Sequence, residues 1–240
     1  HAILRNFPLV GRSRWIIEGI RPFIQQYILE TDTGGAPISR MFRNIVYQRA
    51  KNSRDTIPFG TQLDTYQTGY EWIGHSLSAL NVKDIDIQPR VTIGSRHCKQ
   101  PYSASILNIS AMSFGSLSKP ALQALNKGAK AGGFYHNTGE GGVSPYHLEY
   151  GADVVWQVGT GYFGCRTDLG GFDAEKFEKQ ASHTNIKMIE IKLSQGAKPG
   201  HGGILPASKN TQEIADIRGV QVGTQVDSPS THSAFSSPIE

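Results

Sequence analysis

The order of short apolar runs, glycine-rich loops and helix-forming segments from residue 105 onward most constrains how this chain folds. Apolar runs at residues 105–110, 153–158 and 186–193 are each followed by a glycine-rich loop and then by a helical pattern. This recurrence is typical of parallel β/α units. In barrels and open parallel sheets, the loops after the strands lie on the ligand-binding face. The sequence therefore predicts an α/β fold whose site is built from these loops.

Signals for helix ends support this division of the chain. Ser118 is a suitable N-cap, Pro120 falls in the first turn, and Gly132–Gly133 provides the stop of the first helix. Residues 134–142 add a brief strand with its own glycine loop. Helical patterns at residues 172–182 and 211–218 complete the later units.

Residues 1–60 predict a helical arm, and residues 61–104 predict an irregular lead-in. The stretch 14–30 has apolar residues at three-to-four spacing, interrupted by Pro22, and a second amphipathic helix ends near Asn52. We expect these helices to dock as a pair on the main domain. Short strands are expected in the lead-in near residues 85–87 and 91–93.

Positive charge is concentrated in the arm. Residues 1–60 contain nine Lys or Arg and four Asp or Glu, whereas the whole chain has a net charge of only +4. Cations interleaved with aromatic residues on one face, as nucleic-acid binding requires, do not occur, so we expect no nucleic-acid partner. Peripheral contact between the arm and an anionic membrane surface remains an alternative. The sequence has no apolar run of 18 residues, so we expect no membrane span.

Cysteine usage favours a reducing compartment. Cys98 and Cys165 are 67 residues apart and neither belongs to a CxxC pair, which excludes a disulfide scaffold and a self-contained zinc or iron–sulfur site. The histidines are scattered and show no metal-ligand spacing, so no metal ligand is assigned. We expect a cytoplasmic protein, with association at the cytoplasmic face of a membrane as the alternative.

The segment GTGYFG, residues 159–164, matches the dinucleotide pattern GxGxxG by coincidence. A dinucleotide fold needs a helix that starts within the motif, whereas residues 165–173 contain two further glycines that oppose a helix. The segment GAKPGHGG also fails the P-loop pattern, which needs GK[ST] at a helix start. Neither glycine pattern predicts a nucleotide-phosphate site.

Three longer motifs resemble the synthase domain of glutamate synthases. They are SAMSFGSLS (110–118), NTGEGG (137–142) and QGAKPGHGGILP (195–206), and they occur in order and at consistent spacing. The resemblance is greatest to the stand-alone members that lack a glutaminase domain. It implies a (β/α)8 TIM-barrel fold that carries FMN at the C-terminal ends of its strands. Only the N-terminal half of the barrel, its first β/α units in residues 105–240, is expected in this chain.

The resemblance also implies which residues contact the flavin. A lysine near flavin N1 and the C2 carbonyl would stabilise the negative charge of the reduced ring. The segment Ala111 to Ser113 would run along the isoalloxazine, where backbone N–H groups would meet N5 or O4. The expected FMN contacts are Ala111, Met112, Ser113, Gln157 and Lys192.

By the same resemblance, three residues would serve catalysis or substrate binding. Lys198 would lie between the flavin and the substrate, where it could also bind a carboxylate. Glu140 is the one acid of the glycine loops and would handle protons of an amine or imine. Arg218 falls where the family has a substrate-side arginine. The implied reaction is hydride transfer from flavin N5 to 2-iminoglutarate, formed from 2-oxoglutarate and ammonia.

The chain departs from the pattern of full glutamate synthases at three positions. Tyr162, Ile204 and His201 replace an arginine, a glutamine and a glutamate, respectively, which weakens the expectation of a dicarboxylate substrate. The FMN phosphate loop and the cysteines for a [3Fe-4S] cluster are expected further on, outside this chain. The sequence names neither the electron donor nor the source of ammonia. The alternative function is a non-catalytic half-barrel that acts as a binding or assembly module, for example as a homo-oligomer joined across open strand edges.

Overall fold

The computed structural model describes residues 2–53, 60–196, 200–237 and 239–240. It divides into two compact units, residues 1–79 and 80–240. Lys198, the expected catalytic lysine, lies outside the described residues.

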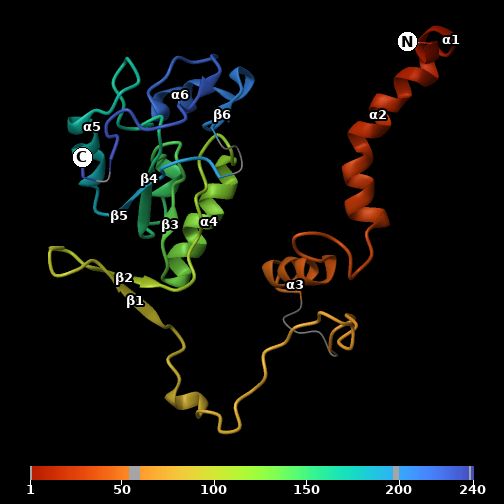
Figure 1. Cartoon of the computed structure of the whole chain (residues 1–240), viewed down its shortest axis with the longest axis horizontal. Coiled ribbons are helices and arrows are strands. Elements are labelled where there is room, and N and C mark those ends of the chain that lie inside the picture. The colour runs from red at the N-terminus through yellow and green to blue at the C-terminus, as the bar shows by residue number, and fades with distance from the viewer. Residues whose placement is uncertain (1, 54–59, 197–199, 238) are drawn as a thin grey trace. The chain divides into compact units, whose positions relative to one another are not determined.

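The first unit consists mainly of helices (Figure 1). Helix α1 spans Ala2–Asn6, α2 spans Pro8–Ile24, the π-helical turn η1 spans Gln25–Leu29, and α3 spans Arg40–Ala50. Glu30, just after η1, forms an ion pair with Arg43 of α3. The predicted interruption at Pro22 is wrong, because the helix runs past this residue and widens into η1. The N–H of Gln25 reaches back to the carbonyls of both Arg21 and Pro22.

The second unit begins with an irregular segment and an antiparallel strand pair. The short helix η2 spans Val82–Asp84, and β1 (Arg90–Ile93) pairs with β2 (Tyr102–Ser105). The predicted strand near residues 91–93 is confirmed. The one predicted near residues 85–87 is wrong, because side chains hold this region in turns. Asn81 accepts the N–H of Lys83, and Asp86 accepts that of Gln88.

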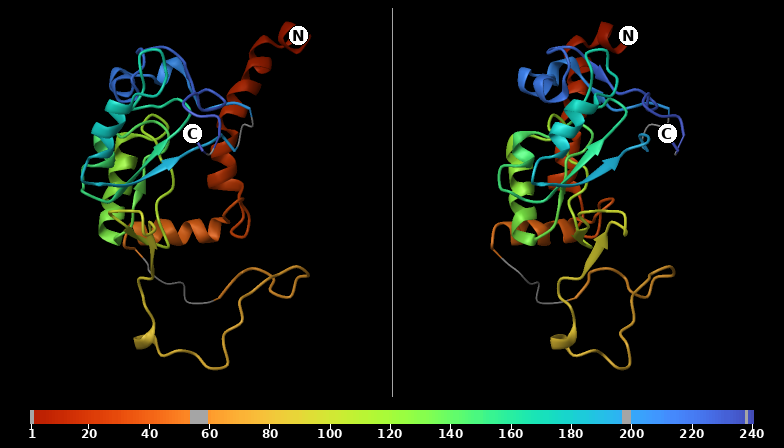
Figure 2. Two further views of the ribbon diagram at one scale, coloured as in Figure 1. Left: turned by 60° about the vertical axis from the view of Figure 1, so that its left-hand side comes forward. Right: turned by 90° about the vertical axis from the view of Figure 1, so that its left-hand side faces the viewer.

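A parallel sheet forms the centre of the second unit. Its strands β3 (His136–Asn137), β4 (Val154–Val158) and β5 (Ile186–Ile191) lie side by side in chain order (Figures 1 and 2). Residues 105–110 were predicted as a full strand, but β2 ends at Ser105 and Ile109 contributes only a parallel bridge to His136. The fold is therefore mixed α/β with a parallel sheet.

Helices follow these strands as predicted. Helix α4 (Lys119–Gly132) ends at Gly133, which adopts the left-handed conformation that glycine allows. The Asp173 side chain caps α5 (Ala174–Ala181), and the Thr211 side chain caps α6 (Gln212–Arg218). The remaining elements are short: η3 (Pro145–His147), η4 (Ala207–Lys209) and the antiparallel strands β6 (Ile204–Leu205) and β7 (Val226–Asp227).

Alternation along β4 separates two faces of the sheet. Trp156 is fully buried and stacks on Phe177 of α5, within a cluster that also contains Tyr162 and Cys165. Gln157, one residue on, faces the opposite side, as the period of two in a strand requires. A second apolar cluster packs α4 and α6 against the loops that follow the strands; its buried members are Phe114, Leu122, Phe163, Leu205, Ile214 and Val226.

Candidate functional site

A cavity of about 360 Å³ lies at the C-terminal ends of the parallel strands. Its wall is made by the segments that follow Ile109, β3 and β5, by the end of β4, and by β6 and the last residue of α6. Six residues that the sequence predicted for the site line it: Ala111, Ser113, Glu140, Gln157, Lys192 and Arg218. These residues lie up to 107 positions apart in the chain and are brought together by the parallel strand order.

An ion pair between Lys192 and Glu140 crosses this cavity. The Lys192 Nζ lies 3.4 Å from the Glu140 Oε1, and their side chains are only 26% and 17% exposed. The backbone N–H of Lys192 donates to the Val158 carbonyl at 2.9 Å, which continues the β4–β5 ladder by one residue. The sheet therefore fixes the point from which the lysine side chain enters the cavity.

Two glycines from other loops leave room for the Glu140 carboxylate. A Cβ at Gly159 would lie 2.7 Å from Glu140 Oε2, and a Cβ at Gly203 would lie 2.5 Å from Oε1. Real side chains do not approach so closely. Glycines in the loops after β4 and β5 thus make space for the acid in the loop after β3.

A polar cluster lies beside the ion pair on the same face of the sheet. Glu190, two residues before Lys192, accepts hydrogen bonds from Asn137 Nδ2 at 3.0 Å and from Gln157 Nε2. The other amide atom, Gln157 Oε1, is buried and has no hydrogen-bond partner among the described residues. A buried acceptor without a partner is costly, so this atom is available to a donor on a ligand.

Arg218 closes one side of the cavity and is 7% exposed. Its Nη2 donates to the Phe114 carbonyl at 3.2 Å, and its guanidinium lies 5.0 Å from the centre of the Phe163 ring. Burial lowers the pKa of Arg218, and nearby Glu140 raises it. Within the described residues, its Nε has no hydrogen-bond partner.

The segment Ala111 to Ser113 forms part of the cavity wall. Ala111 and Ser113 line the cavity, whereas the Met112 side chain packs on the apolar cluster around Phe114. The Met112 N–H donates to the Asn137 carbonyl at 3.1 Å. Gly139 has a φ of +65°, and a Cβ there would lie 3.0 Å from the Ser113 nitrogen. Close contact between these two loops therefore depends on this glycine.

The family model for the conserved region in glutamate synthase matches residues 48–240. The chain belongs to the glutamate synthase family. The glutamate synthase large subunit-like protein YerD of Bacillus subtilis (strain 168) is 34% identical over 279 aligned residues, which cover 100% of this chain and 53% of YerD. An archaeal-type glutamate synthase [NADPH] of Thermotoga neapolitana is 30% identical over 95% of this chain and 42% of its own length. The chain thus spans about half the length of these relatives.

The three positions expected to depart from the pattern of full glutamate synthases lie in different surroundings. Ile204 lines the cavity, and His201 is exposed. Tyr162 is 2% exposed and does not line the cavity. Its hydroxyl accepts the N–H groups of Ser233 and Ala234 at 3.0 and 3.1 Å. The tyrosine therefore holds the C-terminal segment.

Sequence reasoning missed several residues of the site. Asn137 and Glu190 support Gln157, and Gln195, Lys209 and Ser228 line the cavity. Alternation along β5 could have identified Glu190, because residues 190 and 192 share one face of the strand. Asn137 begins the motif NTGEGG. Lys209 ends the short helix η4 and Ser228 directly follows the two-residue strand β7, and both elements are too short to give a periodic signal.

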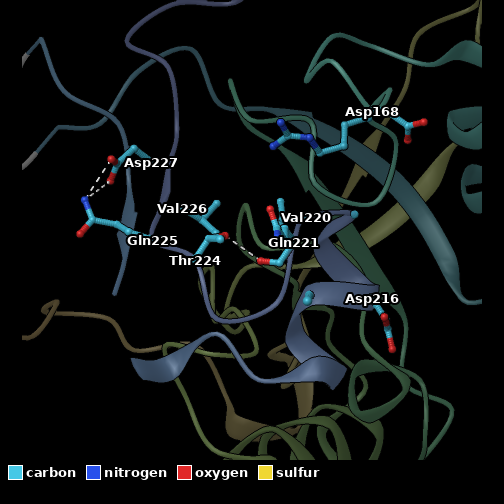
Figure 3. A pocket seen from close by; sticks show the side chains of 11 residues that line it. Asp168, Asp216, Val220, Gln221, Thr224, Gln225, Val226 and Asp227 are labelled. Carbon is cyan, nitrogen blue, oxygen red and sulfur yellow. Dashed lines mark hydrogen bonds between the residues drawn. The ribbon is translucent and has the colours of Figure 1, made fainter. Parts of the chain in front are cut away.

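A second cavity, of about 630 Å³, lies beside α6 and β7 (Figure 3). None of the predicted site residues that the structure describes lines it. Its aspartates lie apart, and two already accept hydrogen bonds: Asp216 from Gln212 Nε2 at 2.7 Å, and Asp227 from Gln225 Nε2 at 3.0 Å. We therefore take the cavity around Glu140 and Lys192 as the candidate site.

No helix in the described part of the chain combines the length and apolar character that crossing a bilayer requires.

Proposed function

We propose that the chain is the N-terminal part of an FMN-dependent, glutamate-synthase-like oxidoreductase. The observation that carries the proposal is the cavity at the carboxyl ends of the parallel strands, which gathers the residues of three family motifs. Catalytic sites of (β/α)8 barrels are built from the loops at this end of the strands. The sequential order of Ile109, β3, β4 and β5 supports such a barrel, because doubly wound sheets reverse their strand order. Residues 105–240 would form its first β/α units, after the arm at 1–60 and the lead-in at 61–104.

The residues of the cavity fit FMN in chemistry. Gln157 Oε1 is a buried acceptor without a partner in the described chain, and the flavin ring has one N–H donor between two carbonyl groups. Among the described lining residues, three cations (Lys192, Lys209 and Arg218) outnumber one carboxylate, Glu140, which suits an electron-rich ring and an acidic substrate. When bound, FMN supplies hydride transfer at N5.

The residues of this chain would then have separate roles in binding and catalysis. Lys192 would lower the energy of negative charge on the ring, and Glu140 would hold or release a proton at the substrate nitrogen. Arg218 and Lys198 would bind the carboxylate of a 2-oxo acid or amino acid, with 2-iminoglutarate as the family's substrate. With its Nζ 3.4 Å from the Glu140 Oε1, Lys192 would hold the carboxylate in place until substrate enters.

Native mass spectrometry of the protein at its natural length tests this function. Retention of one FMN, followed by loss of FMN from a Lys198→Ala variant or loss of its turnover, is the expected result. A wild-type protein that takes up no FMN would overturn the proposal. The [3Fe-4S] cluster of the family would require cysteines outside residues 1–240, and iron and sulfide analysis of the same sample tests for it.

One observation favours the alternative, an assembly module. Three apolar residues of β5 and the segment just after it, Ile189, Ile191 and Leu193, are 38%, 56% and 66% exposed, so this strand offers apolar surface to further protein. A second copy of the chain could cover it. Native mass spectrometry separates the two functions, because a dimer of 26.2 kDa chains without flavin would support the module.

We further propose that α2 contacts an anionic membrane surface. One broad helical face is apolar, and its members are 45–83% exposed: Leu9, Val10, Ile16, Ile17, Ile20 and Phe23. At 100° per residue, Arg12 falls at one edge of this face, and Arg14 and Arg21 fall at the other edge. Arginines that flank an apolar face are typical of helices that lie in a lipid interface.

Flotation with vesicles tests this contact. The protein is expected to float with vesicles that contain phosphatidylserine at low salt, and less at high salt. An Arg12→Gln/Arg14→Gln/Arg21→Gln variant should lose flotation, whereas Arg49→Gln on α3 should keep it. Equal flotation of both variants, or none by the wild type, would contradict the proposal.

A further inference from the structure

His147, which lies outside the cavity, contacts the wall of the candidate site through its ring. It is fully buried at the end of η3, and its Nε2 lies 2.8 Å from the carbonyl oxygen of Met112. Met112 sits between Ala111 and Ser113, both of which line the cavity. The contact spans 35 residues of sequence and joins η3 to the segment expected along the flavin.

The hydrogen bonds of His147 fix its tautomer. The backbone N–H of Ser144 lies 3.1 Å from Nδ1, and a backbone N–H can only donate, so Nδ1 is an acceptor. The Ser144 hydroxyl also lies 2.8 Å from Nδ1. The proton of the neutral ring must therefore be on Nε2, and it is donated to the Met112 carbonyl. Burial lowers the pKa of His147, which favours this neutral form.

Helix α4 holds His147 in place from the other side. Asn126, fully buried on α4, donates from Nδ2 to the His147 carbonyl at 2.5 Å. Its Oδ1 accepts the N–H of Tyr150 at 2.9 Å. Hydrogen bonds thus join α4 to the backbone of His147, and the imidazole of His147 to the wall of the cavity.

Two bonds anchor Met112 from opposite directions. Its N–H donates to Asn137 of β3, and its C=O accepts from His147. Together they fix the orientation of the peptide groups on both sides of Met112. These groups belong to Ala111 and Ser113, so their orientation decides which backbone atoms face the cavity.

We propose that His147 is a positioning residue for the flavin-facing segment Ala111 to Ser113. The imidazole links this loop to α4 and keeps the backbone of the loop oriented toward the flavin ring. This inference rests on the proposed FMN function. It adds a residue that touches neither cofactor nor substrate but sets the geometry of those that do.

A matched pair of amide variants separates positioning from simple folding. In His147→Gln, the amide nitrogen can occupy the place of Nε2 and still donate to the Met112 carbonyl. In His147→Asn, the shorter amide can occupy only the place of Nδ1 and loses that bond. FMN dissociation constants are measured by quenching of flavin fluorescence on the protein at its natural length, with urea unfolding of each variant alongside.

We expect FMN affinity to fall about fivefold to tenfold in His147→Asn and by less than about twofold in His147→Gln, the scale of one lost hydrogen bond. Equal FMN affinity of the two folded variants would overturn the inference and leave the proposed function intact. If the wild type binds no FMN, both the inference and the proposed function are overturned.

A measurement on the wild type keeps the inference falsifiable if His147→Asn does not fold. Imidazole nitrogen NMR should show His147 protonated at Nε2, and its N–H signal should shift when FMN binds, because the loop that accepts its bond contacts the ring. An Nδ1-protonated ring, or an Nε2–H signal that FMN leaves unchanged, would overturn the positioning role.

Discussion

Lys192 and Glu140 form an ion pair, with Nζ and Oε1 3.4 Å apart, although they come from different loops and their side chains are largely buried. Neither could adopt this position alone, because an unpaired charge in such a site would be costly to desolvate. Glycines at 159 and 203 leave space for the acid, and the β4–β5 ladder fixes the lysine. The ion pair therefore depends both on the β4–β5 pairing and on glycines in two other loops.

Lys192→Ala should weaken FMN binding about tenfold, which corresponds to about 1.4 kcal/mol, because the ring loses a partly buried cation. The matched control is Lys187→Ala, which removes a more exposed lysine from the other end of β5. FMN dissociation constants of the two variants provide the measurement. If both variants bind FMN as tightly as the wild type, Lys192 does not contact the flavin.

Glu140→Gln should slow turnover about a hundredfold or more and change FMN affinity far less. The amide keeps the shape of the side chain but cannot take up a proton, and general acid–base catalysis contributes at this scale. Glu149→Gln, a change at an exposed glutamate that accepts hydrogen bonds from Gln123, is the control. Steady-state rates and FMN affinities are compared. A variant with normal turnover and weak FMN binding would make Glu140 a structural residue of its loop.

The two cysteines should differ strongly in reactivity. Cys98 is exposed, whereas burial raises the pKa of the Cys165 thiol to about 12. Because the thiolate is the reactive form, a thiol reagent at pH 8 should modify Cys98 quickly and leave Cys165 unmodified in the folded protein. In urea both should react, and Cys98→Ser should remove the fast phase only. Rapid modification of Cys165 in the folded protein would contradict its buried position.

Local sequence signals predicted the elements of the second unit well. Pro120 at a helix start and Gly133 at its end are cues that act within a few residues, and α4 follows both. The strand predicted at residues 105–110 does not form as a whole. Ser105 is the last residue of β2, and Ile109 pairs only through one bridge to His136. Strand formation depends on a partner elsewhere in the chain, which a local pattern does not contain.

The sequence predicted which residues line the candidate site better than it predicted the contacts among them. The family resemblance identified Glu140 and Gln157, but only the pairing of β4 with β5 places Glu190 beside Gln157. The need for glycine at position 159 follows only from the structure, in which the Glu140 carboxylate occupies the space that a Cβ of residue 159 would fill. Such relationships join distant loops, so sequence reasoning could name the residues without the contacts among them.

His136 should make the stability of the protein depend on pH. It is fully buried beside His147, with ring centres 5.0 Å apart, and neither of its ring nitrogens has a partner among the described residues. Burial, and then the neighbouring His147, lower the pKa of His136 to about 4 from an ordinary value of 6.5. The folded protein therefore resists protonation of this ring.

The sign of the effect follows from the two pKa values of His136. Between pH 6.5 and 4 the unfolded chain binds a proton that the folded protein excludes, so the free energy of unfolding should fall as pH falls. The slope from this one group should approach about 1.4 kcal/mol per pH unit. Above pH 6.5 the histidine should add no pH dependence.

Urea unfolding between pH 4.5 and 7.5 measures this dependence of the free energy of unfolding on pH. His136→Gln should flatten the curve, whereas His97→Gln, at an exposed site, should not. Parallel curves for wild type and His136→Gln, together with an NMR titration of His136 near 6.5, would contradict the burial of a neutral ring.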